Sequence, residues 1–325
     1  MPSGKLSVII PTYNRKEILC RTLEAYRSQL GQEEILEVLV ADDGSTDGTE
    51  SVVAESNERF PFPVRYLRQN NRGQASARNL GIREARGEIV LFGDDDIIPA
   101  SNLVFEHMSW HRKYPEAAVG VLGRVAWSPE VHPTPFMKWL AFAGPLTDYQ
   151  ALSPGMPVDS AHFYSGNISL KLEYLRKNGT FDEDFRAYGY EDFELGYRLT
   201  KKGLRLLYNP DAVAYHYKYV SFADICRRAQ LMDAAEKVLR TKEAWACHAE
   251  MTARLHDSLQ RPIRKVLRRW LTPPLTLLKP LLDTQIPLPW IVYRWLYHYY
   301  GAPRTKPGGT TIRNAVKAPT TRRED

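Results

Sequence analysis

The sequence predicts an α/β fold with a mostly parallel sheet flanked by helices. Short apolar runs alternate with helical segments of about ten or more residues, which is typical of strands joined by crossover helices. Polar residues directly follow several of these runs. The chain has 325 residues, 43% of them hydrophobic, so we expect one main domain with a real core and an appendage.

The expected elements follow one another along the chain in a regular order. We predict strands at 6–10, 35–41, 64–67, 89–92 and 119–126, and helices at 16–29, from about 48 to 59, at 74–84 and at 103–113. The segment 128–160, rich in Pro and aromatic residues, is expected to form loops over the site. The later pattern predicts helices at 168–177, 191–201 and 222–259, and closing strands at 204–208 and 212–215.

Three strands of the predicted sheet end in polar residues. Thr12 and Tyr13 follow the first strand, Asp42 and Asp43 the second, and three consecutive aspartates, 94–96, the fourth. Because ligands of such sheets bind beyond the carboxyl ends of the strands, we expect these side chains to share one site.

The three aspartates have two interpretations. Close carboxylates repel each other unless a cation lies among them, and hard oxygen ligands favour Mg²⁺ or Mn²⁺ shared with substrate phosphates. The alternative is a solvated acidic turn before the next helix. The other polar strand ends favour the cation site.

The motifs and their order resemble those of the family 2 glycosyltransferases. The resemblance covers roughly residues 5–217 and implies the GT-A fold, a nucleotide-sugar donor, a divalent metal and inversion at the anomeric carbon. The motifs that carry it are Val8-Ile9-Ile10-Pro11-Thr12-Tyr13-Asn14, Val40-Ala41-Asp42-Asp43-Gly44-Ser45-Thr46-Asp47, Gly73 with Ala77-Arg78-Asn79, Asp94-Asp95-Asp96, and Glu191-Asp192-Phe193-Glu194-Leu195.

The nucleotide is expected at the first strand ends. Tyr13 offers a flat face for the base, and Asp43, at the position that reads the base in the family, can accept a base N–H. The alternative for the Asp43 segment is a plain turn, in which Asp47 caps a helix. The full nucleotide-binding prediction is Pro11, Thr12, Tyr13, Asn14, Asp43, Arg78, Asp94 and Asp95.

Arg78 has two compatible interpretations. Its planar guanidinium can bind a phosphate, the ribose or Asp43. It can also be a structural arginine that pairs with the strand-end carboxylates.

The predicted metal ligands are Asp96, Asp94 and His216, with Mn²⁺ or Mg²⁺ as the cofactor. The resemblance implies that Asp95 faces the ribose and Asp96 the metal. The usual family pattern has an aspartate where this chain has Gly93, which leaves open which pair of aspartates binds. His216 either completes the coordination or is an ordinary residue at a strand end.

The predicted catalytic residues open the helix at 191. A carboxylate near the acceptor hydroxyl can remove its proton during attack, and Asp192 matches the family's base position, with Glu191 beside it. The alternative is a carboxylate that caps the helix. Glu194 is assigned to an i,i+4 pair with Arg198. Gly166 and Asn167 resemble a family element near the donor sugar.

The C-terminal region differs from the rest in charge. Residues 1–220 sum to −4 and residues 221–325 to +10, with five cations within 261–269. We predict a catalytic domain at 1–220, a helical basic-aromatic region at 221–300, and a disordered tail at 301–325. No stretch has the apolar length of a membrane span, so we expect residues 261–300 to bind an anionic membrane surface or to pack on the catalytic domain.

The compartment is inferred from cysteines and the N-terminus. Three separate cysteines and no CxxC pair disfavour a disulfide framework or a cysteine zinc site. The strand pattern begins near Lys5, which leaves no room for a signal peptide. We expect a cytoplasmic protein at the inner face of the cell membrane, and no nucleic-acid binding, because the catalytic edge is acidic.

The sequence therefore predicts a metal-dependent inverting glycosyltransferase in cell-envelope polysaccharide biosynthesis. Its donor is a nucleoside-diphosphate sugar, with UDP favoured over dTDP or GDP, and its acceptor is a glycan or a lipid-linked hydroxyl. A nucleotidyltransferase is the first alternative, but it needs a Gly-rich loop that Pro11–Arg15 lacks. An inactive nucleotide-sugar-binding scaffold is the second.

Overall fold

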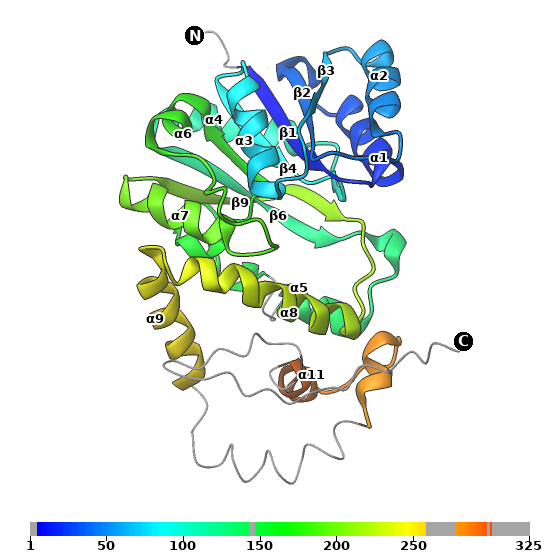
Figure 1. The fold of residues 1–325 in the computed structure, drawn as a ribbon, viewed down its shortest axis with the longest axis vertical. Helices are drawn as coiled ribbons and strands as arrows, with labels where there is room; N and C mark the ends of the chain where they lie inside the picture. Colours follow the sequence, from blue (N-terminus) through cyan, green and yellow to red (C-terminus); the bar gives the residue numbers. More distant parts are fainter. Residues whose placement is uncertain (1–4, 143–146, 258–276, 298–299, 301–325) are drawn as a thin grey trace, which may run out of the picture.

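The computed structural model describes residues 5–142, 147–257, 277–297 and 300. Its centre is one mixed sheet with strands in the order β3-β2-β1-β4-β8-β6-β9-β5, with β7 added against β9. The strands are β1 Leu6–Thr12, β2 Ile35–Asp42, β3 Val64–Arg68, β4 Ile89–Gly93, β5 Ile97–Pro99, β6 Val119–Trp127, β7 Pro157–Val158, β8 Asn167–Lys171 and β9 Arg205–His216. Figure 1 shows the helices on both faces of this sheet.

Helices cover both faces of the sheet, because successive side chains of each strand point to opposite faces and both faces are apolar. One face packs on α1 (Lys16–Arg27), α2 (Thr49–Arg59) and α4 (Leu103–Lys113). The other packs on α3 (Gln74–Glu84), α6 (Leu172–Asn178) and α7 (Glu191–Lys201). In β4, Leu91 points to the first layer and Phe92 to the second, as the strand period of two requires.

The sheet is parallel in its first half and mixed in its second. Strands β1 to β4 pair in parallel as predicted, whereas β8 pairs antiparallel with both β4 and β6. The predicted helix at 168–177 is wrong in its first part, since residues 167–171 form β8 and the helix α6 begins at Leu172. Ile168 and Leu170 alternate with polar residues, which is the strand period of two, and the helical pattern begins only at Leu172.

Two further elements differ from the prediction. The closing strands at 204–208 and 212–215 form one strand, β9, in which residues 209–212 bulge opposite Gly123 of the neighbouring β6. The described part of the predicted loop region 128–160 contains the helix α5 (Pro135–Phe142), the strand β7 and the 3₁₀ turns Pro129–Val131 and Tyr149–Ala151. The strand β5 was not predicted.

The C-terminal helices lie together below the sheet in Figure 1: α8 Phe222–Leu239, α9 Ala244–Asp257 and α11 Trp290–Leu296. Ser221 and Asp224 form a capping box that starts α8. A separate apolar cluster joins α8 and α11 to α5, with Phe136, Phe222 and Leu296 among its buried members. The cations of 261–269 and the tail 301–325 lie outside the described residues.

Candidate active site

The strand-end carboxylates are buried, so they do not form a solvated acidic turn. Asp95 is 4% and Asp96 5% exposed, at the end of β4, while Asp94 is partly exposed. Burial raises the pKa of Asp95 to about 7, against the opposing effect of Arg15. Crowded carboxylates in this setting favour a cation.

Arg15, directly after the first strand's polar segment, supplies a cation to these carboxylates. Its guanidinium donates to Oδ1 of Asp95 at 2.7 Å and to Oδ2 of Asp96 at 2.6 Å. Thr12 also donates to Asp95, at 2.8 Å. Arg15 was not among the predicted site residues, although its place after a strand-end motif was visible in the sequence.

His216 joins the same group because of the sheet register. Strand β5 follows the aspartates directly, and its Ile97 pairs with His216 at the end of β9. The imidazole Nε2 therefore lies 3.3 Å from Oδ2 of Asp96, and the ring stacks on Trp127. His216 and Arg15 together hold the pKa of the Asp96 carboxyl far below its usual range, despite burial.

Asp96 and His216 are ligand types that a divalent cation can use. A carboxylate oxygen and an imidazole nitrogen converge, which suits Mn²⁺, and Arg15 already places positive charge against the same oxygen. No group of three or more His, Cys, Asp or Glu side chains with metal-binding geometry occurs among the described residues. The protein thus offers Asp96 and His216, and a diphosphate would have to complete the coordination.

Asp94 belongs to a second cluster, centred on Arg78. The guanidinium of Arg78, only 2% exposed, donates to Asp94 at 2.8 Å. Its other terminal nitrogen lies 3.4 Å from Glu191 and 3.8 Å from Oδ1 of Asp192. Arg78 thus pairs with strand-end and helix carboxylates, as the structural interpretation expects, and it does not contact Asp43.

The helix α7 aims Asp192 and Glu191 at Arg78. Burial raises the pKa of both carboxyls, and Arg78 opposes the rise. The backbone N–H of Ser165 donates to Oδ2 of Asp192 at 3.0 Å, whereas the buried Oδ1 has no hydrogen-bond partner. A carboxylate with a raised pKa and an oxygen free to accept a proton has the properties of a general base.

Asp94 and Gly166 connect the two clusters to the predicted donor-sugar segment. A Cβ on Gly166 would lie 3.2 Å from Oδ2 of Asp94, so the backbone approaches this carboxylate closely. The structure therefore brings Asp94, Asp96 and Asp192 to one edge of the sheet, through Arg78 and the consecutive aspartates. This is the arrangement on which the sugar-transfer interpretation depends.

The expected base site combines turn residues with one exposed ring. Asp42 accepts from Ser45 and Tyr66, and Gly44 has φ +93°, so this segment is a true turn. Asp43 accepts from Gln69 and from the backbone N–H groups of Arg72 and Gly73, which leaves Oδ2 room for one further donor. Tyr13 is 47% exposed.

Asn14 and Asp47 hold the loops around this site. Asn14, with φ +53°, accepts from the backbone of Thr46. The carboxylate of Asp47 accepts from the first N–H groups of two helices, Lys16 of α1 and Thr49 of α2. Asp47 thus caps helices as predicted, and Pro11 is a buried part of β1.

The glycine that departs from the family pattern has a packing reason. A Cβ on Gly93 would lie 2.9 Å from the hydroxyl of Tyr26, a buried residue of α1. An aspartate at this position would collide with Tyr26. The acidic function is therefore restricted to residues 94–96.

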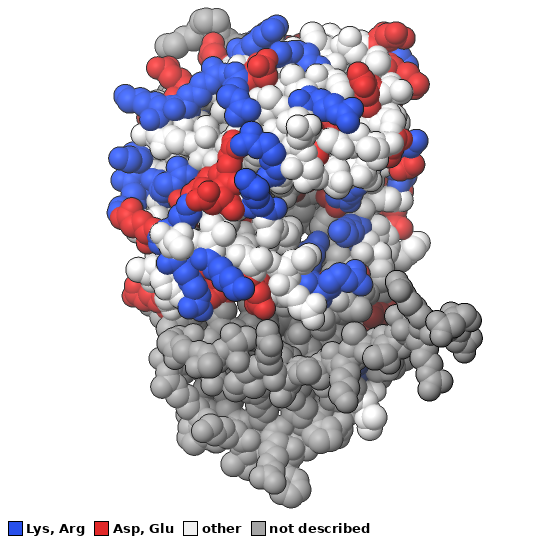
Figure 2. Space-filling view, viewed as in Figure 1, with Lys and Arg blue, Asp and Glu red and all other residues white. Residues whose placement is uncertain are grey.

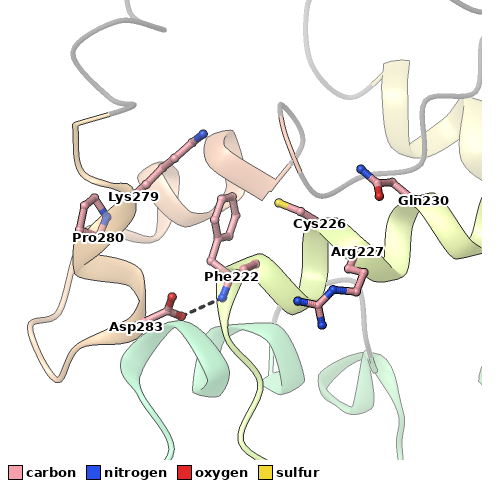
Figure 3. Close-up of a pocket in the computed structure, with 8 residues that line it drawn as sticks. Phe222, Cys226, Arg227, Gln230, Lys279, Pro280 and Asp283 are labelled. Carbon is pink, nitrogen blue, oxygen red and sulfur yellow. Dashed lines mark hydrogen bonds between the residues drawn. The ribbon is translucent and has the colours of Figure 1, made fainter. Parts of the chain in front are cut away.

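A hollow of about 560 Å³ lies elsewhere, between α8 and the 3₁₀ turn Lys279–Asp283. Figure 3 shows Phe222, Cys226 and Arg227 on one side and Lys279 and Pro280 on the other. Asp283 accepts the backbone N–H of Phe222 at 2.8 Å. None of the predicted site residues lines it.

The fold and this site define a glycosyltransferase of the GT-A class. Among solved structures, the mannosyltransferase PcManGT from Pyrobaculum calidifontis, in complex with GDP-Man and Mn²⁺, has a TM-score of 0.56 and 22% identity over 90% of this chain and 86% of that chain. S. aureus TarS 1-349 in complex with UDP has a TM-score of 0.55 and 21% identity over 91% of each. These likenesses concern the fold.

The chain belongs to glycosyltransferase family 2. It matches the profile Glycosyl transferase family 2 over residues 7–167 and Glycosyl transferase family group 2 over 91–302. An uncharacterized glycosyltransferase of Bacillus subtilis, YfnE, is 31% identical over 67% of this chain and 66% of its own. Validoxylamine A glucosyltransferase of Streptomyces hygroscopicus subsp. limoneus is 34% identical over 61% of this chain and 48% of its own length.

The match covers only part of these relatives. It spans about two thirds of the Bacillus protein, about half of the Streptomyces enzyme, and 24% of the chondroitin synthase of Pasteurella multocida, which is 29% identical over 65% of this chain. The prediction of a family 2 glycosyltransferase with the GT-A fold is confirmed.

Proposed function

We propose that the protein is a metal-dependent inverting glycosyltransferase with Asp192 as its general base. It transfers a sugar from a nucleoside-diphosphate sugar to a hydroxyl of a glycan or lipid-linked acceptor. The observation that carries the proposal is the position of Asp192, which lies in the same network as the strand-end aspartates. One of its oxygens is fixed by Ser165, and the other is buried without a hydrogen-bond partner.

The reaction follows from one carboxylate on the acceptor side. Asp192 takes the proton of the acceptor hydroxyl while that oxygen attacks the anomeric carbon. The bond from this carbon to the diphosphate oxygen breaks, and the nucleoside diphosphate leaves with its electron pair. Because the acceptor oxygen attacks and the diphosphate departs on opposite faces of the anomeric carbon, a single displacement inverts the configuration of this carbon. The neighbouring Glu191 is proposed as an acceptor contact.

The donor side is assigned to the other predicted residues. Tyr13 and Asp43 would hold the base, with UDP favoured over dTDP and GDP, and Asp95 would face the ribose. Gly166 would face the sugar, whereas the side chain of Asn167 is buried and its amide donates to the carbonyls of Arg124 and Ala212, so we assign Asn167 to supporting this segment from behind. A Mn²⁺ or Mg²⁺ ion held by Asp96 and His216 would stabilise the charge that develops on the diphosphate. PcManGT, with GDP-Man and Mn²⁺, and TarS, with UDP-GlcNAc, support a nucleotide-sugar donor and a divalent metal.

The base assignment is tested by Asp192→Asn, which keeps the shape of the side chain and removes its basicity. We expect kcat to fall by about 10²-fold or more, while donor binding, measured by thermal shift with UDP and Mn²⁺, is kept. Glu194→Gln on the same helix is the matched control, since Glu194 pairs with Arg198. Wild-type turnover in Asp192→Asn would reject the assignment.

The wider role is proposed from relatives and from the C-terminal surface. The chondroitin synthases among the relatives support polysaccharide biosynthesis, here in the cell envelope. The division into a catalytic part at 1–220 and a helical part at 221–300 remains our proposal. In Figure 2, Lys and Arg side chains are interspersed with acidic ones on the face shown.

We also propose peripheral attachment at the inner face of the cell membrane. Within the described part of the chain, no helix is long and apolar enough to cross a bilayer. Apolar side chains of the C-terminal segment are nevertheless exposed, among them Leu277, Ile286, Trp290 and Ile291. Arg294 lies over the ring of Trp290, a pairing suited to a lipid interface. Sedimentation with phosphatidylserine vesicles but not with neutral ones is expected, and equal sedimentation with both would contradict it.

A further inference from the structure

A buried chain of polar side chains runs behind the carboxylates, from Lys171 to Asn167. Asn167, Ser169 and Lys171 are alternate residues of β8, so they share one face of that strand. His107 and His111, four residues apart on one face of α4, lie against them. Asn167, Ser169, His107 and His111 are each no more than 4% exposed.

Each contact in this chain is short. Lys171 Nζ lies 2.7 Å from Nδ1 of His111, and Nε2 of His111 lies 2.7 Å from the hydroxyl of Ser169. The same hydroxyl lies 2.8 Å from Nδ1 of His107, and Nε2 of His107 lies 2.8 Å from Oδ1 of Asn167.

The two ends of the chain fix the direction of every hydrogen bond. The Lys171 ammonium has only donors, and its acceptors are His111 and the carbonyls of Tyr114 and Val119. The Asn167 amide donates to the carbonyls of Arg124 and Ala212, so its Oδ1 must face His107 and accept. These two anchors define the tautomers between them.

Both histidines are therefore neutral and carry their proton on Nε2. His111 accepts from Lys171 and donates to Ser169, Ser169 donates to His107, and His107 donates to Asn167. Burial lowers the pKa of His107 to about 4 and that of His111 well below its usual value, which agrees with two neutral rings.

Asn167 connects the buried chain to the candidate active site. The two preceding residues contact the reaction carboxylates, since the N–H of Ser165 donates to Asp192 and Gly166 lies against Asp94. Asn167 itself pairs with Gly93, immediately before the three aspartates. A Cβ on Gly123 would lie 2.3 Å from the Asn167 amide, so the absence of a side chain at Gly123 makes room for this amide.

We propose that His107 is a positioning residue for the base Asp192. By fixing the amide of Asn167, His107 holds the 165–167 segment so that the Ser165 N–H and the Asp94 contact stay in place. The proposal rests on the role of Asp192 proposed above. His107 acts through Asn167 and does not touch the substrate.

Two substitutions separate positioning from packing. In His107→Gln, the amide nitrogen can occupy the place of Nε2 and keep the donation to Asn167. In His107→Asn, the amide oxygen can occupy the place of Nδ1 and accept from Ser169, but Asn167 loses its donor. We expect kcat to fall by about 10-fold or more in His107→Asn and to be largely kept in His107→Gln, with similar melting temperatures.

The control for lost stability is Tyr174→Phe, which removes a buried hydrogen bond to Leu199 away from the site. This variant should melt at a lower temperature and keep its kcat. Equal kcat in the two His107 variants, or no larger loss in His107→Asn than in Tyr174→Phe, would overturn the proposal.

A second measurement needs neither activity nor a variant. Nitrogen-15 NMR of histidine-labelled wild-type protein should show His107 and His111 as neutral Nε2–H tautomers with slowly exchanging protons. An Nδ1–H tautomer at His107 would contradict the hydrogen-bonded chain described above. If His107→Asn does not fold, this NMR result is the test of the proposal. Absence of sugar transfer in the wild type would instead reject the proposed function and leave the NMR result valid.

Discussion

Two arginines face the strand-end carboxylates, and they differ in their access to solvent. Arg15 pairs with Asp95 and Asp96 while its side chain is 37% exposed, whereas Arg78 pairs with Asp94 and Glu191 at 2% exposure. A buried cation among carboxylates cannot leave without stranding their charge. An exposed one can swing into water and be replaced. We therefore expect Arg78 to be a permanent part of the site and Arg15 to exchange with a divalent cation.

The largest expected effect is that of Arg78→Met. It leaves Asp94, Glu191 and Asp192 together without their cation, and breaking a buried ion pair costs about 3–5 kcal/mol. Urea unfolding should show this loss of stability, and transfer activity should fall as well.

Arg65→Met is the matched control, because Arg65 pairs with the buried Glu37 away from the site. We expect it to lower stability and leave turnover intact. If Arg78→Met unfolds at the same urea concentration as the wild type, the buried cluster does not need its arginine and the contrast with Arg15 fails.

Lowering the pH extends the comparison to a third buried group, His107. Neither arginine changes its charge between pH 7 and pH 4, whereas His107 takes up a proton in this range. In the unfolded chain, His107 takes up a proton at about pH 6.5, whereas in the folded protein burial lowers its pKa to about 4. The free energy of unfolding therefore falls as the pH drops from 6.5 to 4. Its titratable neighbours are His111, whose pKa is also lowered by burial, and Lys171.

We expect the free energy of unfolding to be lower at pH 5 than at pH 7, with about 2 kcal/mol of the difference due to His107. The measurement is urea unfolding at pH 5 and at pH 7. His107→Gln should show a smaller difference, and an unchanged difference would mean that His107 takes up its proton at the same pH in the folded and the unfolded chain.

The smallest expected effect on stability is that of Arg15→Gln. Partly exposed ion pairs contribute about 1 kcal/mol or less, so urea unfolding should change little. Mn²⁺ should bind more tightly in the absence of donor, because Arg15 no longer competes for the Asp96 oxygen. Titration of Mn²⁺ followed by electron paramagnetic resonance would measure this.

Arg21→Gln in the helix α1, which begins directly after Arg15, is the control, since Arg21 pairs with the exposed Glu130. Weaker Mn²⁺ binding in Arg15→Gln than in Arg21→Gln would show that Arg15 supports the cation site instead of competing with it.

The two halves of the sheet differ in how well the sequence predicts them. Strands β1 to β4 and their helices lie close to the predicted ranges, because each crossover is local and each apolar run is bounded by turn residues. The second half contains β5, β8 and the continuous β9, which were missed or misassigned. Their pairing joins residues far apart in the chain, such as Ile97 with His216, and no local pattern reports it.

The site shows the same division. Asp94–Asp96, Asp192 and Arg78 could be found because they belong to motifs at strand and helix ends. Arg15 and His107 could not, because a cation after a strand and a histidine on a helix have many ordinary explanations. Only contacts with Asp96 and Asn167 give them a role.

The sequence alone determined the chemical groups: carboxylates at strand ends, a carboxylate pair opening a helix, and apolar runs that require a layered α/β fold. The tertiary structure decided which of these groups lie together, because antiparallel pairing of β5 with β9 sets His216 beside Asp96 and the fold brings Arg78 of α3 beside Asp192 of α7. The physical reason is that distance and burial determine the interaction of charges, and both depend on segments more than a hundred residues apart.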